Sequence, residues 1–182
     1  NQTHSFLCHM RRRQFCPFQK KYMMNEKQPV TEFARTLQKD LYNYLLSLNK
    51  VDAHLPDAPD IEEKWLQIAN AYMPDAVREF NKYPTVVFGW MMYIGMAVAK
   101  YWDEDWELYN KVENLYLYLR NRIDFDHMDD YIREKVLCLN TEQAQTLQSI
   151  VGECAARTNN ILQHFPITHG SEDAYRAVVA AL

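Results

Sequence analysis

The sequence predicts an all-α fold, a bundle of about six to seven antiparallel helices around a central hydrophobic helix at about 84–101. Apolar residues recur every three or four positions along most of the chain, which is the period of an amphipathic helix. Only four of the 182 residues are glycine, whereas all-β chains need more of them for tight turns. Hydrophobic residues make up 48% of the chain, enough to form a core without a metal or a disulfide.

Residues 1–25 differ from the rest, because their charged residues are all basic and they have no helical period. We expect a disordered or appended segment that is dispensable for folding, followed by a single helical domain at 26–182. A basic arm for nucleic acid or an anionic membrane is one alternative. The other is a zinc site made by His4, Cys8, His9 and Cys16, although their spacing matches no standard zinc finger. All 24 acidic residues lie beyond this segment, so nucleic-acid binding by the acidic body is not expected.

The first two helices are predicted at about 31–48 and from Asp60 onward. The apolar face of the first holds Phe33, Leu37, Leu41, Tyr44 and Leu48. A loop at 52–59 contains two prolines, and Asp60 with Glu63 resembles a capping box. The apolar face of the second holds Ile61, Trp65, Ile68 and Tyr72. We expect Pro74 to kink or restart this helix, because proline removes a backbone donor.

The third helix, opened by Pro84 and running to about Tyr101, is the most apolar. Its uncharged stretch is at the short limit for a bilayer span. Being apolar on all sides, it fits the centre of a bundle better. We therefore expect no membrane span and nearly complete burial of Met92, Ile94 and Val98.

Further helices are predicted at about 104–122, at about 127–138, and after Asn140. Asn140 is expected to cap the last of these, with Gln143 as the reciprocal residue of a capping box. The apolar face of the 104–122 helix holds Leu108, Val112, Leu115, Leu119 and Ile123. That of the 127–138 helix holds Met128, Ile132, Val136 and Leu139. That of the helix after Asn140 holds Leu147, Val151, Cys154, Ile161 and Phe165. Pro166 is expected to stop the last of these. A seventh helix after Ser171 carries an apolar stripe that predicts self-association, formed by Val178, Val179 and Leu182.

The four cysteines, Cys8, Cys16, Cys138 and Cys154, form no C-x-x-C motif. The last two fall at apolar helical positions, which favours free, buried and reduced thiols. This usage is typical of a cytoplasmic protein.

The best local candidate for a cation site is the turn before the 127–138 helix. It contains Asp124, Asp126, His127, Asp129 and Asp130. Crowded carboxylates repel one another, and an oxygen-rich ligand set favours Mg²⁺ or Ca²⁺. The alternative is an acidic helix start, in which Asp126 caps the helix and Asp129 pairs with Arg133 one turn on.

A second acidic pattern, Asp103-Glu104-x-x-Glu107 followed by Asp126-x-x-Asp129, is similar to the EExxE…ExxD magnesium site of all-α nucleoside triphosphate pyrophosphohydrolases. Both clusters begin their predicted helices. If those helices are antiparallel neighbours, the clusters lie about 25–30 Å apart at the helical rise per residue. Two metal ions separated by about 4 Å cannot bridge that distance.

No Glu-x-x-His pair and no local nucleophile–base arrangement is present. We therefore expect a non-enzymatic protein-interaction or structural domain that binds a protein partner or itself and uses no cofactor. The alternative is a small-ligand-binding protein or metal-dependent enzyme with a pocket between bundle helices, lined by aromatic residues and a few polar groups.

Overall fold

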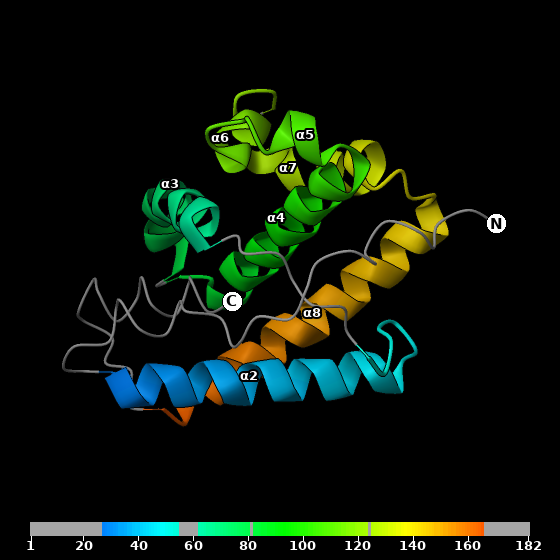
Figure 1. Ribbon diagram of the computed structural model, residues 1–182. Coiled ribbons are helices and arrows are strands. Elements are labelled where there is room, and N and C mark those ends of the chain that lie inside the picture. The colour runs from blue at the N-terminus through cyan, green and yellow to red at the C-terminus, as the bar shows by residue number, and fades with distance from the viewer. Residues whose placement is uncertain (1–26, 55–61, 81, 124, 166–182) are drawn as a thin grey trace.

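The computed structural model describes residues 27–54, 62–80, 82–123 and 125–165. These residues form helices and no strand, so the predicted all-α class is confirmed (Figure 1). The long helices are α2 (Lys27–Ser47), α3 (Glu62–Phe80), α4 (Pro84–Glu104) and α8 (Thr141–Gln163). The short ones are α5 (Trp106–Tyr109), α6 (Leu115–Arg120), the 3₁₀-helix η1 (Phe125–His127), α7 (Met128–Tyr131) and the π-helix η2 (Ile132–Val136).

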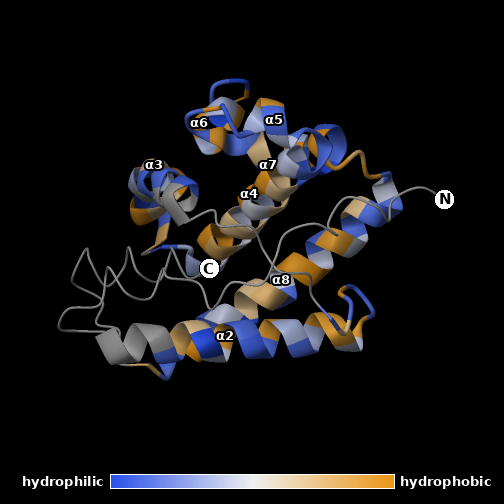
Figure 2. Cartoon of the chain, viewed as in Figure 1, coloured by the Kyte–Doolittle hydropathy of each residue, from blue (hydrophilic) through white to orange (hydrophobic). Residues whose placement is uncertain are grey.

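Helix α4 is the centre of the fold, as the sequence predicted. It packs against α8 on one side and against α3 and the short helices on the other, and it runs opposite to α8 (Figure 1). Its buried residues are Val87, Phe88, Met91, Tyr93, Ile94, Ala97, Val98 and Tyr101. Met92, which we expected to be buried, is only partly buried, whereas Ile94 and Val98 are fully covered. Figure 2 shows that hydrophobic residues are more frequent on α4 than on α2 and α8, on which hydrophilic and hydrophobic residues alternate.

Helix α2 packs on α8 through the predicted stripe, of which Phe33 and Leu37 are buried. The rings of Phe33 and Phe165 meet edge to face, with centroids 5.7 Å apart. On the same interface Arg157 lies 3.3 Å from the Asp40 carboxylate and stacks over the Tyr44 ring. Leu48 lies beyond the end of α2 and is exposed, so the stripe ends one turn earlier than expected.

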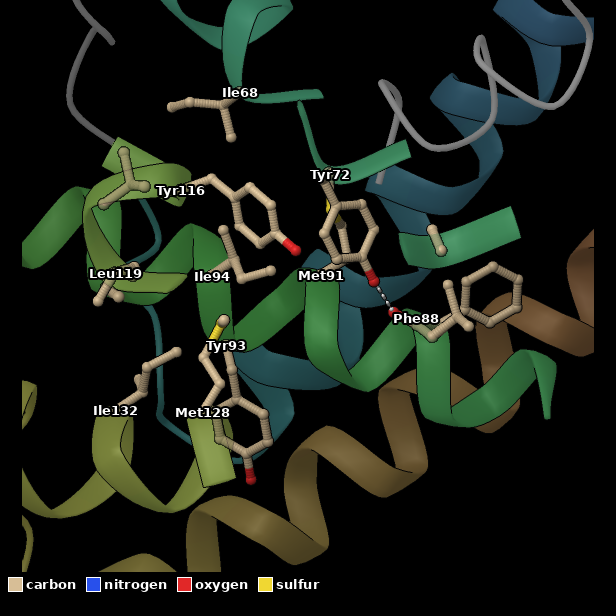
Figure 3. Close-up of a cluster of buried hydrophobic side chains, with 14 of the residues drawn as sticks. Ile68, Tyr72, Phe88, Met91, Tyr93, Ile94, Tyr116, Leu119, Met128 and Ile132 are labelled. Carbon is tan, nitrogen blue, oxygen red and sulfur yellow. Dashed lines mark hydrogen bonds between the residues drawn. The ribbon is translucent and has the colours of Figure 1, made fainter. Parts of the chain in front are cut away.

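Helix α3 continues through Pro74, which does not divide it. Its predicted face is confirmed at Ile68 and Tyr72, which are buried against α4 and α6. The Tyr72 hydroxyl donates a hydrogen bond of 2.9 Å to the carbonyl of Val87, and its ring meets Tyr116 edge to face (Figure 3).

The predicted continuous helix at 104–122 is wrong. Asp105 adopts φ −155° and ends α4, and its side chain accepts a hydrogen bond from the Leu108 amide at the start of α5. Asn114 caps α6 in the same way through the Leu117 amide. The stripe is therefore interrupted: Leu115 and Leu119 are buried, but Leu108 is 55% exposed.

The predicted helix at 127–138 is also irregular, because a 3₁₀ turn, a single α turn and a π turn follow one another. Its inward face is nevertheless confirmed at Met128, Ile132 and Val136. Cys138, two residues after the π turn, lies in the left-handed region with φ 52° and is exposed, which corrects the expected burial of this thiol. Cys154 is buried, as predicted.

The predicted Asn140 cap is confirmed in full, since Asn140 and Gln143 exchange both bonds of a capping box. The predictions for 1–25, the Asp60 cap, Pro166 and the helix after Ser171 lie outside the described residues. Within the described residues, no helix has the length and apolarity needed to cross a bilayer.

Candidate functional site

The acidic turn is held by Arg133, a residue that is itself 8% exposed. Its guanidinium lies 3.6 Å from the Asp129 carboxylate and also pairs with Asp130. The predicted Asp129–Arg133 pair is therefore confirmed. The repulsion between the two carboxylates is relieved by a cation from the chain itself.

Arg133 is also held by an aromatic residue of α4, Tyr93. It lies over the Tyr93 ring, 5.5 Å from the centroid, and donates a hydrogen bond to the Tyr93 hydroxyl. Burial lowers the pKa of Arg133, but the hydrogen bonds with Asp130 and Tyr93, together with the charges of Tyr93 and Asp129, raise it, and the net pKa is raised. The guanidinium therefore stays charged at every physiological pH.

The other members of the predicted cation site are arranged less closely. Asp126 and His127 are exposed, and His127, not Asp126, occupies the N-cap position of α7, without a side-chain cap bond. Asp124 lies outside the described residues. Among the described residues no three Asp, Glu, His or Cys side chains converge on a point that could hold a metal ion. The cation site at this turn therefore stays a prediction.

Beside Arg133 an open polar groove of about 490 Å³ separates η2 from the start of α8. One wall is formed by Asp130, Arg133 and Glu134, and the other by Thr141, Gln145 and Gln148. A second hollow, lined by Trp90 and Tyr93 among others, has the aromatic walls that the sequence suggested for a ligand pocket. Its volume is about 10 Å³, room for about one water molecule.

A buried polar cluster joins α3 to α6 and was missed by the sequence reasoning. The carboxylate of Asp75, a residue 7% exposed, accepts hydrogen bonds from the Tyr116 hydroxyl and the Arg120 guanidinium. Burial, together with the Asp75 hydrogen bond and charge, raises the pKa of Tyr116. Because its charge is paired and its oxygens are used, this cluster acts as a tie between helices.

Apart from Leu48, the exposed large apolar side chains of the described residues come from two parts of the chain. One group, at the junction of α3 and α4, is Val77, Tyr83 and Val86; the other, on α5 and α6, is Trp106, Leu108 and Leu117. Trp106 and Leu108 of the second group belong to a run of six exposed residues, Asp-Glu-Asp-Trp-Glu-Leu at 103–108, which we name the α5 ridge. The sequence reasoning placed Leu108 in the core and did not identify this surface.

The α5 ridge is followed in the chain by Tyr109, which belongs to a cluster of three tyrosines that we name the tyrosine base. The rings of Tyr101, Tyr109 and Tyr118 lie within 4.6–6.1 Å of one another, from α4, α5 and α6. Burial, with smaller contributions from neighbouring tyrosines, raises the pKa of Tyr101 to about 12. Trp106 meets the edge of Trp102, whose buried Nε1 donor has no hydrogen-bond partner within the described part of the chain.

Charge on the α5 ridge is one-sided. Asp103, Glu104, Asp105 and Glu107 flank Trp106 in the sequence. Glu104 pairs with Lys100 at 3.0 Å, and Asp105 caps α5. Asp103 and Glu107 form no ion pair with any described residue.

No protein-family model, no curated protein and no solved structure matches this chain.

Proposed function

We propose that this domain is a non-enzymatic protein-interaction module and that the α5 ridge is its binding surface. The observation that carries the proposal is the exposure of Trp106 and Leu108, 36% and 55%, in the short helix that also carries Tyr109 of the tyrosine base. Single exposed apolar residues are ordinary on protein surfaces. Trp106 and Leu108 lie two positions apart in one short helix and are both exposed, and Trp and Tyr are enriched at interface centres.

The polar groove beside η2 is a weaker basis for function. Its buried cation, Arg133, is already engaged with Asp129, Asp130 and Tyr93, so this guanidinium offers no unpaired positive charge to a ligand. Self-association through the segment after Ser171 remains a separate expectation, and that segment lies outside the described residues.

Site-specific photo-crosslinking tests the proposal. A photoreactive amino acid is placed at Leu108 on the α5 ridge or, as a control, at Lys39, an exposed residue of α2. In the native cell extract we expect discrete light-dependent products from position 108 that disappear when Trp106→Ala is added. Products that are the same at both positions, or none at position 108, would contradict an interaction role for this surface.

A further inference from the structure

We infer that the α5 ridge binds a basic, amphipathic segment of a partner protein, one that presents Lys or Arg beside apolar side chains. This inference rests on the proposed interaction function and adds the chemistry of the partner. Its basis is the combination of one-sided charge with exposed apolar surface in one short run of residues.

Charge complementarity selects the partner. Between residues 100 and 113 there are five acidic and two basic side chains, and one of the two, Lys100, is already paired with Glu104. A partner that covered Trp106 with acidic or uncharged groups would remove water from Asp103 and Glu107 without replacing it by a positive charge, which is unfavourable. A partner that carries Lys or Arg next to its apolar residues pairs with these carboxylates and covers the exposed apolar side chains at the same time.

The tyrosine base shows how a cation is accommodated on this side of the molecule. The Arg122 guanidinium stacks over the Tyr118 ring, 3.9 Å from its centroid, and Tyr118 in turn meets Tyr109 of α5. A guanidinium over an aromatic face beside carboxylates is stabilised by both the ring and the negative charge. The partly exposed Trp106 ring, with Asp103 and Glu107 near it in the chain, offers an aromatic face and negative charge to a partner's arginine.

The probe is an amphipathic helical peptide of leucine and lysine, with two comparison peptides in which every lysine is replaced by glutamate or by glutamine. Binding to the full chain is measured by calorimetry and by the change in tryptophan fluorescence. We expect the lysine peptide to bind at least about tenfold more tightly than either comparison peptide, and its affinity to fall as salt is raised.

Variants separate this surface from the general acidity of the chain. Asp103→Asn with Glu107→Gln should weaken the lysine peptide about tenfold, and Trp106→Ala should weaken it at least as much. The matched control, Glu32→Gln with Asp52→Asn, removes the same charge from exposed positions on α2 and the turn after it, on the far side of α8 (Figure 1). This control should leave the affinity within about twofold. Far-UV circular dichroism verifies that each variant is folded.

The outcomes are distinct. If the glutamine or glutamate peptide binds best and Trp106→Ala removes that binding, the basic partner is ruled out while the interaction surface stands. If the control variant weakens the lysine peptide as much as the ridge variant does, binding is non-specific attraction and the inference fails. If crosslinking from position 108 succeeds but no peptide binds, the inference fails and the proposed function does not.

Discussion

The long helices and the stretch from Asp105 to Leu139 solve the same folding problem by different means. In α4 and α8 the backbone is regular for 21 and 23 residues, and an apolar face buried against neighbours supplies the stability. Between them the chain changes direction repeatedly and forms helices of three to six residues. Helices that short are unstable alone, because the free-energy cost of nucleating a helix exceeds the stabilisation that one or two turns of hydrogen bonds provide.

Polar side chains hold the short segments in place. Asp105 and Asn114 satisfy amides at the starts of α5 and α6, and the Asn114 amide also donates to the carbonyl of Gln67 in α3. Asp75 binds Tyr116 and Arg120 of α6, and Arg133 ties the α7–η2 junction to Tyr93 of α4. The difference teaches that hydrophobic burial sets the paths of the long helices, whereas hydrogen bonds and ion pairs set the path between them.

Truncating the core of α4 should have the largest effect. Phe88 is completely buried and its ring meets Phe80 edge to face, with centroids 5.5 Å apart. Phe88→Ala should lower the free energy of unfolding by about 3–5 kcal/mol, because it leaves a cavity that the long helices cannot close. Urea denaturation followed by circular dichroism measures it. The control is Val86→Ala, at an exposed position two residues earlier on the same helix. It should cost less than about 0.5 kcal/mol.

Removing the tie between α3 and α6 should come second. Asp75→Ala leaves the buried Tyr116 hydroxyl without an acceptor, and it should cost about 2–3 kcal/mol. Tyr116→Phe removes the donor and should cost about 1 kcal/mol. In the double variant the losses should be less than additive, because the two groups share one interaction. Additive losses in urea denaturation would show that the tie does not hold the short segments.

The sequence predicted the long helices because their residues repeat one signal over many turns. The buried α4 was predicted from its continuous apolar run, and the start of α8 from the two residues of the Asn140–Gln143 cap. The same periodicity gave the wrong result at 104–122, since Leu115 and Leu119 do face the core while the backbone before them is broken. Periodicity reports which side chains are inward, and whether the helix is continuous depends on caps at Asp105 and Asn114 that compete with it.

The candidate sites were predictable only where their partners are close in sequence. The Asp129–Arg133 pair is one turn apart and was found, whereas Asp75 and Tyr116 are 41 residues apart and were not. The α5 ridge was missed because a leucine in a helical period was assigned to the core. The available signal was the density of acidic residues around Trp106, which is unfavourable in a buried face.

The tyrosine base should make the short segments sensitive to alkali. The pKa of Tyr101 is raised from 10.0 to about 12, mainly by burial, so the folded state holds the phenolic proton more tightly than the unfolded state does. Its contribution is complete below pH 10 and is lost as the pH rises towards 12. We expect the melting temperature to fall over that interval.

Tyr101→Phe should flatten this fall, because phenylalanine does not ionise. The control is Tyr83→Phe at an exposed tyrosine, which should leave the pH profile unchanged. Calorimetry at a series of alkaline pH values measures both. An unchanged profile for Tyr101→Phe would show that this ring does not limit alkaline stability.

Caps should matter more for a short helix than for a long one. Asn140→Ala removes the cap of α8 and should cost about 1 kcal/mol. Asn114→Ala removes the cap of α6 and also the hydrogen bond of 2.8 Å to Gln67 of α3, so its cost should be larger, about 1.5–2 kcal/mol. Hydrogen exchange of the α6 amides should accelerate in the second variant, while those of α8 barely change in the first. Equal responses would remove the distinction between the two regions.

The smallest effect should be a gain, at Gly152 on the exposed side of α8. A Cβ built at this position meets no atom within 4 Å, and φ is not positive. Gly152→Ala should therefore raise the free energy of unfolding by about 0.5–1 kcal/mol, since alanine loses less conformational freedom in a helix. Gly89→Ala, where the added methyl would lie 3.5 Å from Val151 Cγ1, tests the same propensity at the α4–α8 contact. If Gly152→Ala destabilises the domain while Gly89→Ala does not, a segment outside the described residues or another molecule packs on this side of α8. The regularity of the long helix would then depend on more than the face it buries against α2 and α4.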